Sequence, residues 1–345
     1  MSRENIYGLS REAIAERLTA LGAPAFRARQ VYRWIYAHRV TSFEGMTNLS
    51  VSLRQKLASR FDLAPPSTVE RHVSLDGTVR RLLRLSDERR VETVYIPEPR
   101  RATVCLSTQV GCPLKCSFCF SGTVKLERNL DAGEIVGQFV RATEDVAPLP
   151  SRINVVYMGM GEPLLNADAV IESLRILIDP DGFAVSPRRI TVSTAGMAEE
   201  LPRFVERAPP VGIAVSLHAA TNAKRDLLMP INRRHPIEEL LATTRRLPLS
   251  HRRLLTFEYV LLGGENDAPE DAEALSDLVE GDRAKINLIS YNPWPGSPHR
   301  ASTPERTNQF MERLAAGGHR VSLRRSRGDD VLAACGQLAG QLRSS

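Results

Sequence analysis

The sequence predicts an α/β protein with a small helical module at the N-terminus, a short β-hairpin region, and a core of alternating strands and helices. From about residue 100 onward, short apolar runs typical of buried strands recur, and helical patterns of apolar residues lie between them. The predicted strands are 102–107, 153–158, 189–193, 211–216, 255–261, 284–289 and 319–323. The predicted helices include 132–143, 167–177, 236–246, 269–279, 303–315 and 329–341. Alternation at this spacing favours parallel βα units, arranged either as a barrel or as an open sheet.

The N-terminal module is predicted to span residues 1–65 and to contain three short helices. Ser10 can cap a first helix over 11–21, which Gly22 can end. Pro24 can open a second helix whose polar face is rich in arginine. A third helix is indicated by three leucines spaced four residues apart, namely Leu49, Leu53 and Leu57.

Residues 66–97 are predicted to form a β-hairpin connector between the module and the core. Asp76 and Gly77 form a dipeptide that is favoured in tight hairpin turns, and an apolar run over 78–85 follows it. Residues 91–96 are predicted to be another strand, because their β-branched and aromatic residues end at a proline.

Composition places the chain among ordinary soluble proteins. Hydrophobic residues make up 42% and charged residues 25%, and no run approaches the roughly 18 apolar residues of a membrane span. The N-terminus lacks the apolar segment of a secretory signal, so we expect a cytoplasmic protein without a membrane partner. The formal net charge is +6, and 41 of the 46 basic residues are Arg. This excess is explained equally by codon usage in a GC-rich genome and by a polyanionic partner.

Three of the five cysteines stand in a Cys-x3-Cys-x2-Cys run formed by Cys112, Cys116 and Cys119. A structural zinc site needs four ligands, and Cys105 or Cys335 could supply the fourth, so zinc stays an alternative. Three closely spaced thiolates suit a 4Fe–4S cluster that leaves one iron open for a substrate. The spacing resembles that of the radical S-adenosylmethionine enzymes, in which the open iron binds the amino and carboxylate groups of S-adenosylmethionine.

Several polar or small residues follow predicted strands, where binding sites cluster in βα folds. Gly161 lets the backbone approach a ligand closely, and Glu162 can accept hydrogen bonds from an ammonium group. The other strand-end candidates are Ser193, Ser216, Leu217, His218 and Asn292. Taken singly, such residues are as well explained as helix caps or as structural hydrogen-bond partners.

Taken together, the motifs resemble the RlmN/Cfr family of RNA adenine methyltransferases over nearly the whole chain. The matching segments are 24–34, 91–96, 107–112, 128–130, 158–164, 229–232 and 333–338. The resemblance implies a partial (β/α)6 radical-SAM barrel over residues 98–345 that ends in a helix carrying a catalytic cysteine. It also implies that residues 1–65 are an RNA-binding accessory module.

The resemblance further implies methyl transfer to C2 of adenine 2503 in 23S rRNA, with adenine 37 of tRNA as a second substrate. Cys335 matches the cysteine that is first methylated, and Cys105 matches the one that resolves a covalent RNA adduct through a transient disulfide. Glu92 matches the proton acceptor. Gly161, Glu162, Ser193, Ser216 to His218 and Asn292 match positions that bind S-adenosylmethionine.

Each turnover in the family uses two molecules of S-adenosylmethionine, one 4Fe–4S cluster, an external electron donor and a thiol reductant. The resemblance also implies a monomer.

Three alternatives differ in their chemistry. One is methylation at C8 of adenine, the other branch of the same family. Another is a radical enzyme that modifies a protein, which would not need a basic N-terminal module or two outlying cysteines. The third is an RNA-binding protein that holds zinc or a cluster without catalysis.

Overall fold

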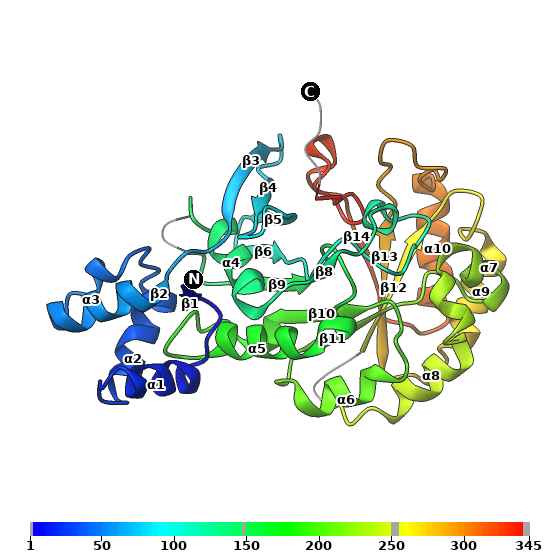
Figure 1. The fold of residues 1–345 in the computed structure, drawn as a ribbon. Coiled ribbons are helices and arrows are strands. Elements are labelled where there is room, and N and C mark those ends of the chain that lie inside the picture. The colour runs from blue at the N-terminus through cyan, green and yellow to red at the C-terminus, as the bar shows by residue number, and fades with distance from the viewer. Residues whose placement is uncertain (1–2, 147–148, 250–254, 341–345) are drawn as a thin grey trace.

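The computed structural model describes residues 3–146, 149–249 and 255–340. Its centre is a ten-stranded sheet in which seven neighbouring strands are parallel. These strands are β6 (Arg101–Cys105), β9 (Ile153–Tyr157), β10 (Ile190–Thr194), β11 (Gly212–Ser216), β12 (Leu255–Leu261), β13 (Ala284–Ser290) and β14 (Val321–Arg324). The sheet curves without closing on itself, which is the architecture of a partial barrel (Figure 1).

Helices follow the parallel strands and lie outside the curve of the sheet, with α5, α6 and α8 along its lower side in Figure 1. They are α4 (Ala132–Ala142), α5 (Ala167–Ile178), α6 (Glu200–Arg207), α7 (Asn222–Leu228), α8 (Ile237–Arg246), α9 (Pro269–Leu278) and α10 (Pro304–Ala316). Each strand's apolar side chains therefore pack against helices on one face, and the large buried core lies between these layers. Within the described ranges, no helix has the length and hydrophobicity needed to cross a bilayer.

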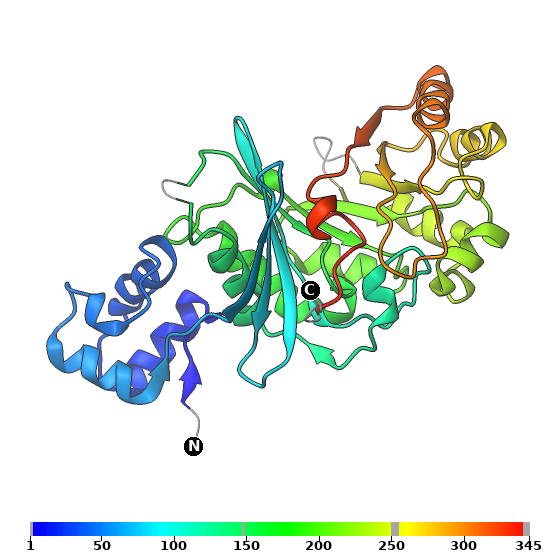
Figure 2. The same ribbon diagram turned by 90° about the horizontal axis from the view of Figure 1, so that it is seen from above.

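The predicted hairpin region continues the same sheet instead of standing apart from it. Strands β3 (Ser67–Val73), β4 (Val79–Arg84) and β5 (Arg90–Glu98) pair in antiparallel fashion, and β5 pairs with β6. The turn predicted at Asp76 and Gly77 is present, with Gly77 at φ +82°. Figure 2 shows these strands as a wall between the N-terminal module and the barrel.

The N-terminal helices are α1 (Arg11–Ala20), α2 (Arg27–Tyr32) and α3 (Val51–Arg60), and α2 continues as a short π-helix over Arg33–Ala37. Pro24 opens a tight turn before α2, so this helix begins three residues later than its sequence predicts. The module has its own apolar cluster, which also includes side chains of α4 and α5. Arg11, Arg29 and Arg33 add ion pairs to Asp181, which follows α5.

The helix predicted over 329–341 is wrong. Within residues 329–340, only Asp329–Val331 forms a 3-10 turn, and the rest consists of turns and irregular backbone. Residue 341 of the predicted helix lies outside the described residues. Leu332, Gly336 and Gly340 adopt φ values of +53°, +84° and +67°, which an α-helix does not allow. The two aspartates and the alanine-rich run favour a helix locally, but hydrogen bonds to distant elements determine the backbone here.

Candidate active site

The three clustered cysteines lie on a loop between the short strands β7 (Gln109–Val110) and β8 (Arg128–Asn129). The backbone folds tightly around them, because Cys119 N–H donates to Cys116 O and Gly122 N–H donates to Cys119 O. A Cβ atom on Gly122 would lie 2.7 Å from Cys116 O, so this turn requires glycine. All three side chains line one cleft at the carboxyl ends of the parallel strands.

The electrostatics of these thiols fit a cationic cofactor. Burial raises the pKa of Cys112 to about 12 and raises the pKa of Cys116 and Cys119 above the ordinary value. Three thiolates are therefore disfavoured here unless positive charge compensates them, as iron would.

The arrangement of the ligands separates a cluster from a single ion. Among the described residues, no three His, Cys, Asp or Glu side chains converge as they would around one metal ion. A cluster takes each thiolate on a different iron, so its ligands need not meet at one point. Three cysteines on one short loop suit the three cysteine-bound irons of a 4Fe–4S cluster with one iron open, whereas a structural zinc site takes four ligands.

Glu162 lies at the end of β9 and faces the same cleft. It is 2% exposed, and its carboxylate accepts hydrogen bonds from the backbone N–H groups of Ala195 (2.7 Å) and Leu164 (3.0 Å). Burial raises its pKa to about 7 against the opposing effect of those bonds. A ligand ammonium group would remove this desolvation penalty by pairing with the carboxylate.

Ser193 on β10, Ser216 at the end of β11 and His218 just after it line the same cleft. His218 has φ +58°, and its Nδ1 accepts a hydrogen bond from Val260 N–H at 2.9 Å. Burial lowers its pKa to about 3, so the ring is neutral near pH 7. Leu217 is fully buried and does not line the cleft.

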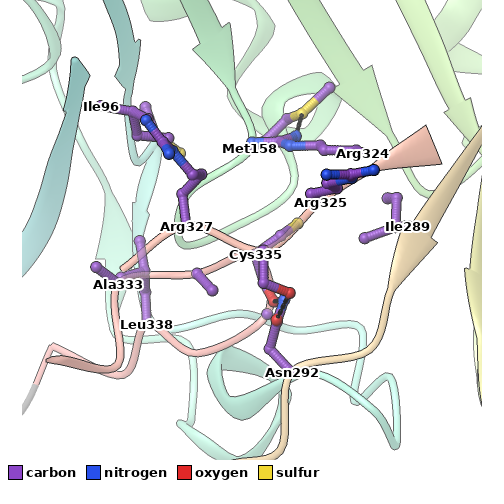
Figure 3. Close-up of a pocket in the computed structure, with 14 residues that line it drawn as sticks. Ile96, Met158, Ile289, Asn292, Arg324, Arg325, Arg327, Ala333, Cys335 and Leu338 are labelled. Atoms are coloured by element: carbon purple, nitrogen blue, oxygen red, sulfur yellow. Dashed lines mark hydrogen bonds between the residues drawn. The ribbon is translucent and has the colours of Figure 1, made fainter. Parts of the chain in front are cut away.

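A second, smaller pocket adjoins the cleft, and both outlying cysteines line it. Figure 3 shows this pocket with Cys335 labelled. Cys105 ends β6, and Cys335 comes from the C-terminal segment. Cys335 lines both the cleft and the smaller pocket. Asn292 lines only the smaller pocket, where its side chain donates to Cys335 O at 3.1 Å. Burial raises the pKa of Cys105 to about 12, although the charge of Arg324 opposes the shift.

Glu92 lines neither pocket. It is fully buried on β5, where Arg80 Nη1 donates to one carboxylate oxygen at 2.7 Å. The other oxygen accepts hydrogen bonds from Ala339 N–H (2.6 Å) and Gly340 N–H (3.1 Å). Glu92 therefore anchors the segment that carries Cys335.

Comparison with known proteins agrees with this geometry. A family model described as "Radical SAM superfamily" matches residues 106–279, and one described as "Ribosomal RNA large subunit methyltransferase N-terminal domain" matches residues 4–63. Two proteins named "Dual-specificity RNA methyltransferase RlmN" are similar over 97% of this chain and 89% of their own length. The one from Dinoroseobacter shibae is 46% identical and the one from Paracoccus denitrificans is 47% identical. The chain belongs to the RlmN family.

A crystal structure of a radical SAM methyltransferase from Sphaerobacter thermophilus has the same fold. It matches with a TM-score of 0.93 and 42% identity over 98% of this chain and all of that one. The predicted fold class and the resemblance to the family are therefore confirmed. The protein is a radical S-adenosylmethionine-dependent RNA methyltransferase, and its family implies a 4Fe–4S cluster, S-adenosylmethionine and an RNA substrate.

Two charged residues of the site were not predicted from the sequence. Glu258 lines the cleft and is 4% exposed, and its carboxylate accepts a hydrogen bond from Asn287 Nδ2 at 2.8 Å. Its position inside the otherwise apolar strand 255–261 was an available signal. Arg324 lines the smaller pocket and donates to Met158 Sδ at 3.2 Å, as Figure 3 shows. Nothing in the local sequence separates Arg324 from the two arginines that follow it closely.

Proposed function

We propose that this enzyme methylates C2 of adenine 2503 in 23S rRNA, with adenine 37 of tRNA as a second substrate. The position of Cys335 carries the proposal, because its side chain lines both the cleft with the clustered cysteines and the pocket with Cys105. One sulfur can therefore meet a methyl donor on one side and a second thiol on the other. The relatives are named as dual-specificity RNA methyltransferases, which supports two RNA substrates.

In this proposal, Cys112, Cys116 and Cys119 hold the cluster, which supplies the electron that cleaves S-adenosylmethionine reductively. Gly161 and Glu162 bind the methionyl end, and the carboxylate of Glu162 receives the ammonium group. Ser193, Ser216 to His218 and Asn292 bind the rest of the molecule. Leu217 contributes through its backbone, since its side chain faces the core.

Cys335 Sγ first attacks the sulfonium methyl of one S-adenosylmethionine and becomes S-methylcysteine. The 5′-deoxyadenosyl radical formed by reductive cleavage of a second S-adenosylmethionine, which also yields methionine, would take one hydrogen atom from this methyl group and leave as 5′-deoxyadenosine. The methylene radical on Cys335 would then add to C2 of the adenine, and the adduct would lose the C2 proton and return one electron, for which the oxidised cluster is the acceptor. Cys105 Sγ, as the thiolate, would then attack Cys335 Sγ and break the bond between sulfur and carbon. The released carbon would take up a proton and become the methyl group on C2, and the two cysteines would be left as a disulfide. An external thiol reductant supplies two electrons to restore both thiols.

Glu92 is the proposed acceptor of the proton that leaves C2. Both of its oxygens are engaged, one by Arg80 and the other by the backbone N–H groups of Ala339 and Gly340. Glu92 is also fully buried and lines neither pocket, so a proton from the adenine can reach it only when residues 339–340 move away. The proposal accordingly includes a shift of the C-terminal segment once RNA is bound.

Labelling experiments test the function with the full-length, anaerobically reconstituted enzyme. Methyl label from S-adenosylmethionine should appear first on Cys335 and then on RNA as 2-methyladenosine. Cys335→Ala should keep about four irons per chain and lose all methyl transfer. Cys105→Ala should accumulate a covalent protein–RNA adduct.

Two outcomes would overturn the proposal. The appearance of 8-methyladenosine without the C2 isomer would assign the other branch of the family. Normal turnover by Cys105→Ala without any adduct would exclude the two-cysteine scheme.

We also propose that the enzyme is a cytoplasmic monomer that receives electrons from an external donor.

A further inference from the structure

Arg225 is a fully buried arginine at the back of the S-adenosylmethionine cleft. It stands on α7 and has no solvent exposure. Its guanidinium donates five hydrogen bonds, all to neutral oxygens. The acceptors are Leu217 O (3.0 Å), Asn232 Oδ1 (2.9 Å), His235 O (3.5 Å), Ala195 O (2.7 Å) and Ser216 O (3.1 Å).

These carbonyl groups belong to the loops that shape the cleft. Ala195 follows β10, and Ser216 and Leu217 end β11, so one guanidinium ties two neighbouring strand ends together. A Cβ atom on Gly196 would lie 3.0 Å from Arg225 Nη2, which shows how closely the loop after β10 surrounds it. Arg225 therefore fixes the positions of Ala195 and Ser216, which both line the cleft.

The charge of Arg225 has no direct carboxylate partner among the described residues. The nearest carboxylate that acts on it, Asp226, is reached through Asn232, whose side-chain nitrogen donates to Asp226 at 2.6 Å. Burial lowers the pKa of Arg225 to about 10, and Cys116 and Asp226 only partly oppose this shift. A buried cation without an ion-pair partner is costly, so an anion is expected nearby.

The missing anion is the cluster site itself. Arg225 donates to the carbonyl groups of Ala195 and Ser216, which line the same cleft as Cys116, so its charge lies next to the cluster site. A cluster bound by three thiolates carries net negative charge. Adding an electron makes this charge more negative. A fixed positive charge in a buried, weakly screened environment then favours the reduced form over the oxidised form.

We propose that Arg225 is a positioning residue with two separable effects, in which its charge favours reduction of the cluster and its five hydrogen bonds hold the cleft open for S-adenosylmethionine. The inference rests on the cluster that family membership implies and on the three cysteines proposed as its ligands. It adds a residue that touches neither the substrate nor the iron.

Two substitutions at this position separate charge from hydrogen bonding. Arg225→Gln removes the charge, whereas Arg225→Lys keeps the charge and reduces the donors from five to three. Arg234→Gln is the matched control, because this arginine lies nearby, pairs with Glu199 at 3.0 Å and has a side chain that is 60% exposed to screening solvent. Asp226→Asn acts in the opposite direction, since it removes negative charge from the neighbourhood of Arg225.

The measurement is a potentiometric titration of the reconstituted full-length enzymes, followed by electron paramagnetic resonance of the reduced cluster. We expect Arg225→Gln to lower the equilibrium constant for reduction at least tenfold, or about 59 mV for one electron. Arg225→Lys and Arg234→Gln should stay within threefold of the wild type. Asp226→Asn should raise the constant. Equilibrium dialysis should show weaker S-adenosylmethionine binding for both Arg225 variants but not for Arg234→Gln.

The possible failures point to different causes. A wild-type potential in iron-loaded Arg225→Gln, or equal shifts in Arg225→Gln and Arg225→Lys, would overturn the role of the charge. If Arg225→Gln does not hold iron, the role of the charge is tested with Asp226→Asn instead. An unchanged or lowered equilibrium constant for cluster reduction in Asp226→Asn would then overturn the inference. If wild-type protein binds no cluster while folding normally, the proposed function itself fails.

Discussion

Substitution of Gly161 by alanine should damage the cleft for two physical reasons that can be measured separately. Gly161 has φ +98°, where a Cβ atom costs about 1–2 kcal/mol in backbone strain. The added carbon would also lie 2.6 Å from Gln109 Cβ and 2.9 Å from Gln109 N. Gln109 is 1% exposed and cannot swing aside, so overpacking adds about 1–3 kcal/mol. The expected loss of stability for Gly161→Ala is therefore about 2–5 kcal/mol.

Two other glycines isolate each contribution. Gly318 has φ +83° with open space around it, so Gly318→Ala should cost only the strain of about 1–2 kcal/mol. Gly159 has no positive φ, but its Cβ atom would lie 2.6 Å from Ser107 Oγ and 2.8 Å from Leu106 C. Gly159→Ala should therefore cost only the overpacking of about 1–3 kcal/mol.

Stability is measured by anaerobic guanidinium denaturation of the metal-free proteins, and the variants are compared where the m-value, the dependence of the free energy of unfolding on denaturant, is unchanged. S-Adenosylmethionine binding is measured on the reconstituted proteins. Binding should weaken in Gly161→Ala, because the added carbon displaces Gln109 and Glu162 N–H donates to Gln109 Oε1. Binding should also weaken in Gly159→Ala, because Gly159 itself lines the cleft. Gly318→Ala should bind normally. The reasoning is refuted if Gly161→Ala is no less stable than Gly318→Ala, or if its affinity for S-adenosylmethionine is unchanged.

Three further substitutions test charge, protonation and docking of the module. Arg80→Met should lower the free energy of unfolding by about 3–5 kcal/mol, because it leaves the Glu92 carboxylate buried without its ion-pair partner. A double-mutant cycle with Glu92→Leu, measured by denaturation, tests this, and additive effects of the two substitutions would contradict it. The pKa of His218 is about 3 in the folded protein and about 6.5 in the unfolded chain, so the free energy of unfolding of the wild type falls as the pH drops below about 6.5. His218→Asn removes this pH dependence and should recover about 2–3 kcal/mol of the stability that the wild type loses by pH 4.5. Helix propensity alone would stabilise Gly133→Ala by up to about 1 kcal/mol, but the added Cβ would lie 2.4 Å from Tyr7 O in the N-terminal module. We therefore expect lower stability and weaker RNA binding, with S-adenosylmethionine binding intact. A variant more stable than the wild type would argue against tight docking of the module.

The sequence predicted those strands, turns and loops that are determined by residues close together in the chain. Strands such as 255–261 are mostly apolar, apart from Thr256 and Glu258, because both faces are buried, and every residue of β12 is indeed buried. The hairpin turn at Asp76 and Gly77 was predictable because few dipeptides tolerate positive φ. The spacing of Cys112, Cys116 and Cys119 placed all three thiols on one short loop, and the structure brings them into one cleft.

What the sequence could not predict depends on partners far away in the chain. Arg225 resembles any other arginine of a short polar helix until five carbonyl or amide oxygens from separate loops surround it. The stretch 329–341 has helical composition, but its polar groups bond elsewhere. Ser121 Oγ donates to Leu338 O at 2.6 Å, and Gln337 Nε2 donates to Pro293 O at 2.7 Å. Local propensity is worth tenths of a kcal/mol per residue, which several such contacts outweigh.

The absence of a helix around Cys335 also bears on how one sulfur could serve two pockets. In a helix, the carbonyl of Cys335 would bond within the helix and the side chain would keep one direction. Here that carbonyl is held by Asn292, and the segment is fastened further along by Ser121 and Glu92. A segment held at separate points by side chains can move its sulfur by exchanging a few hydrogen bonds, without unfolding a helix. The proposed chemistry requires such movement, because Cys335 must first meet a methyl donor in the cleft and later meet Cys105 in the smaller pocket.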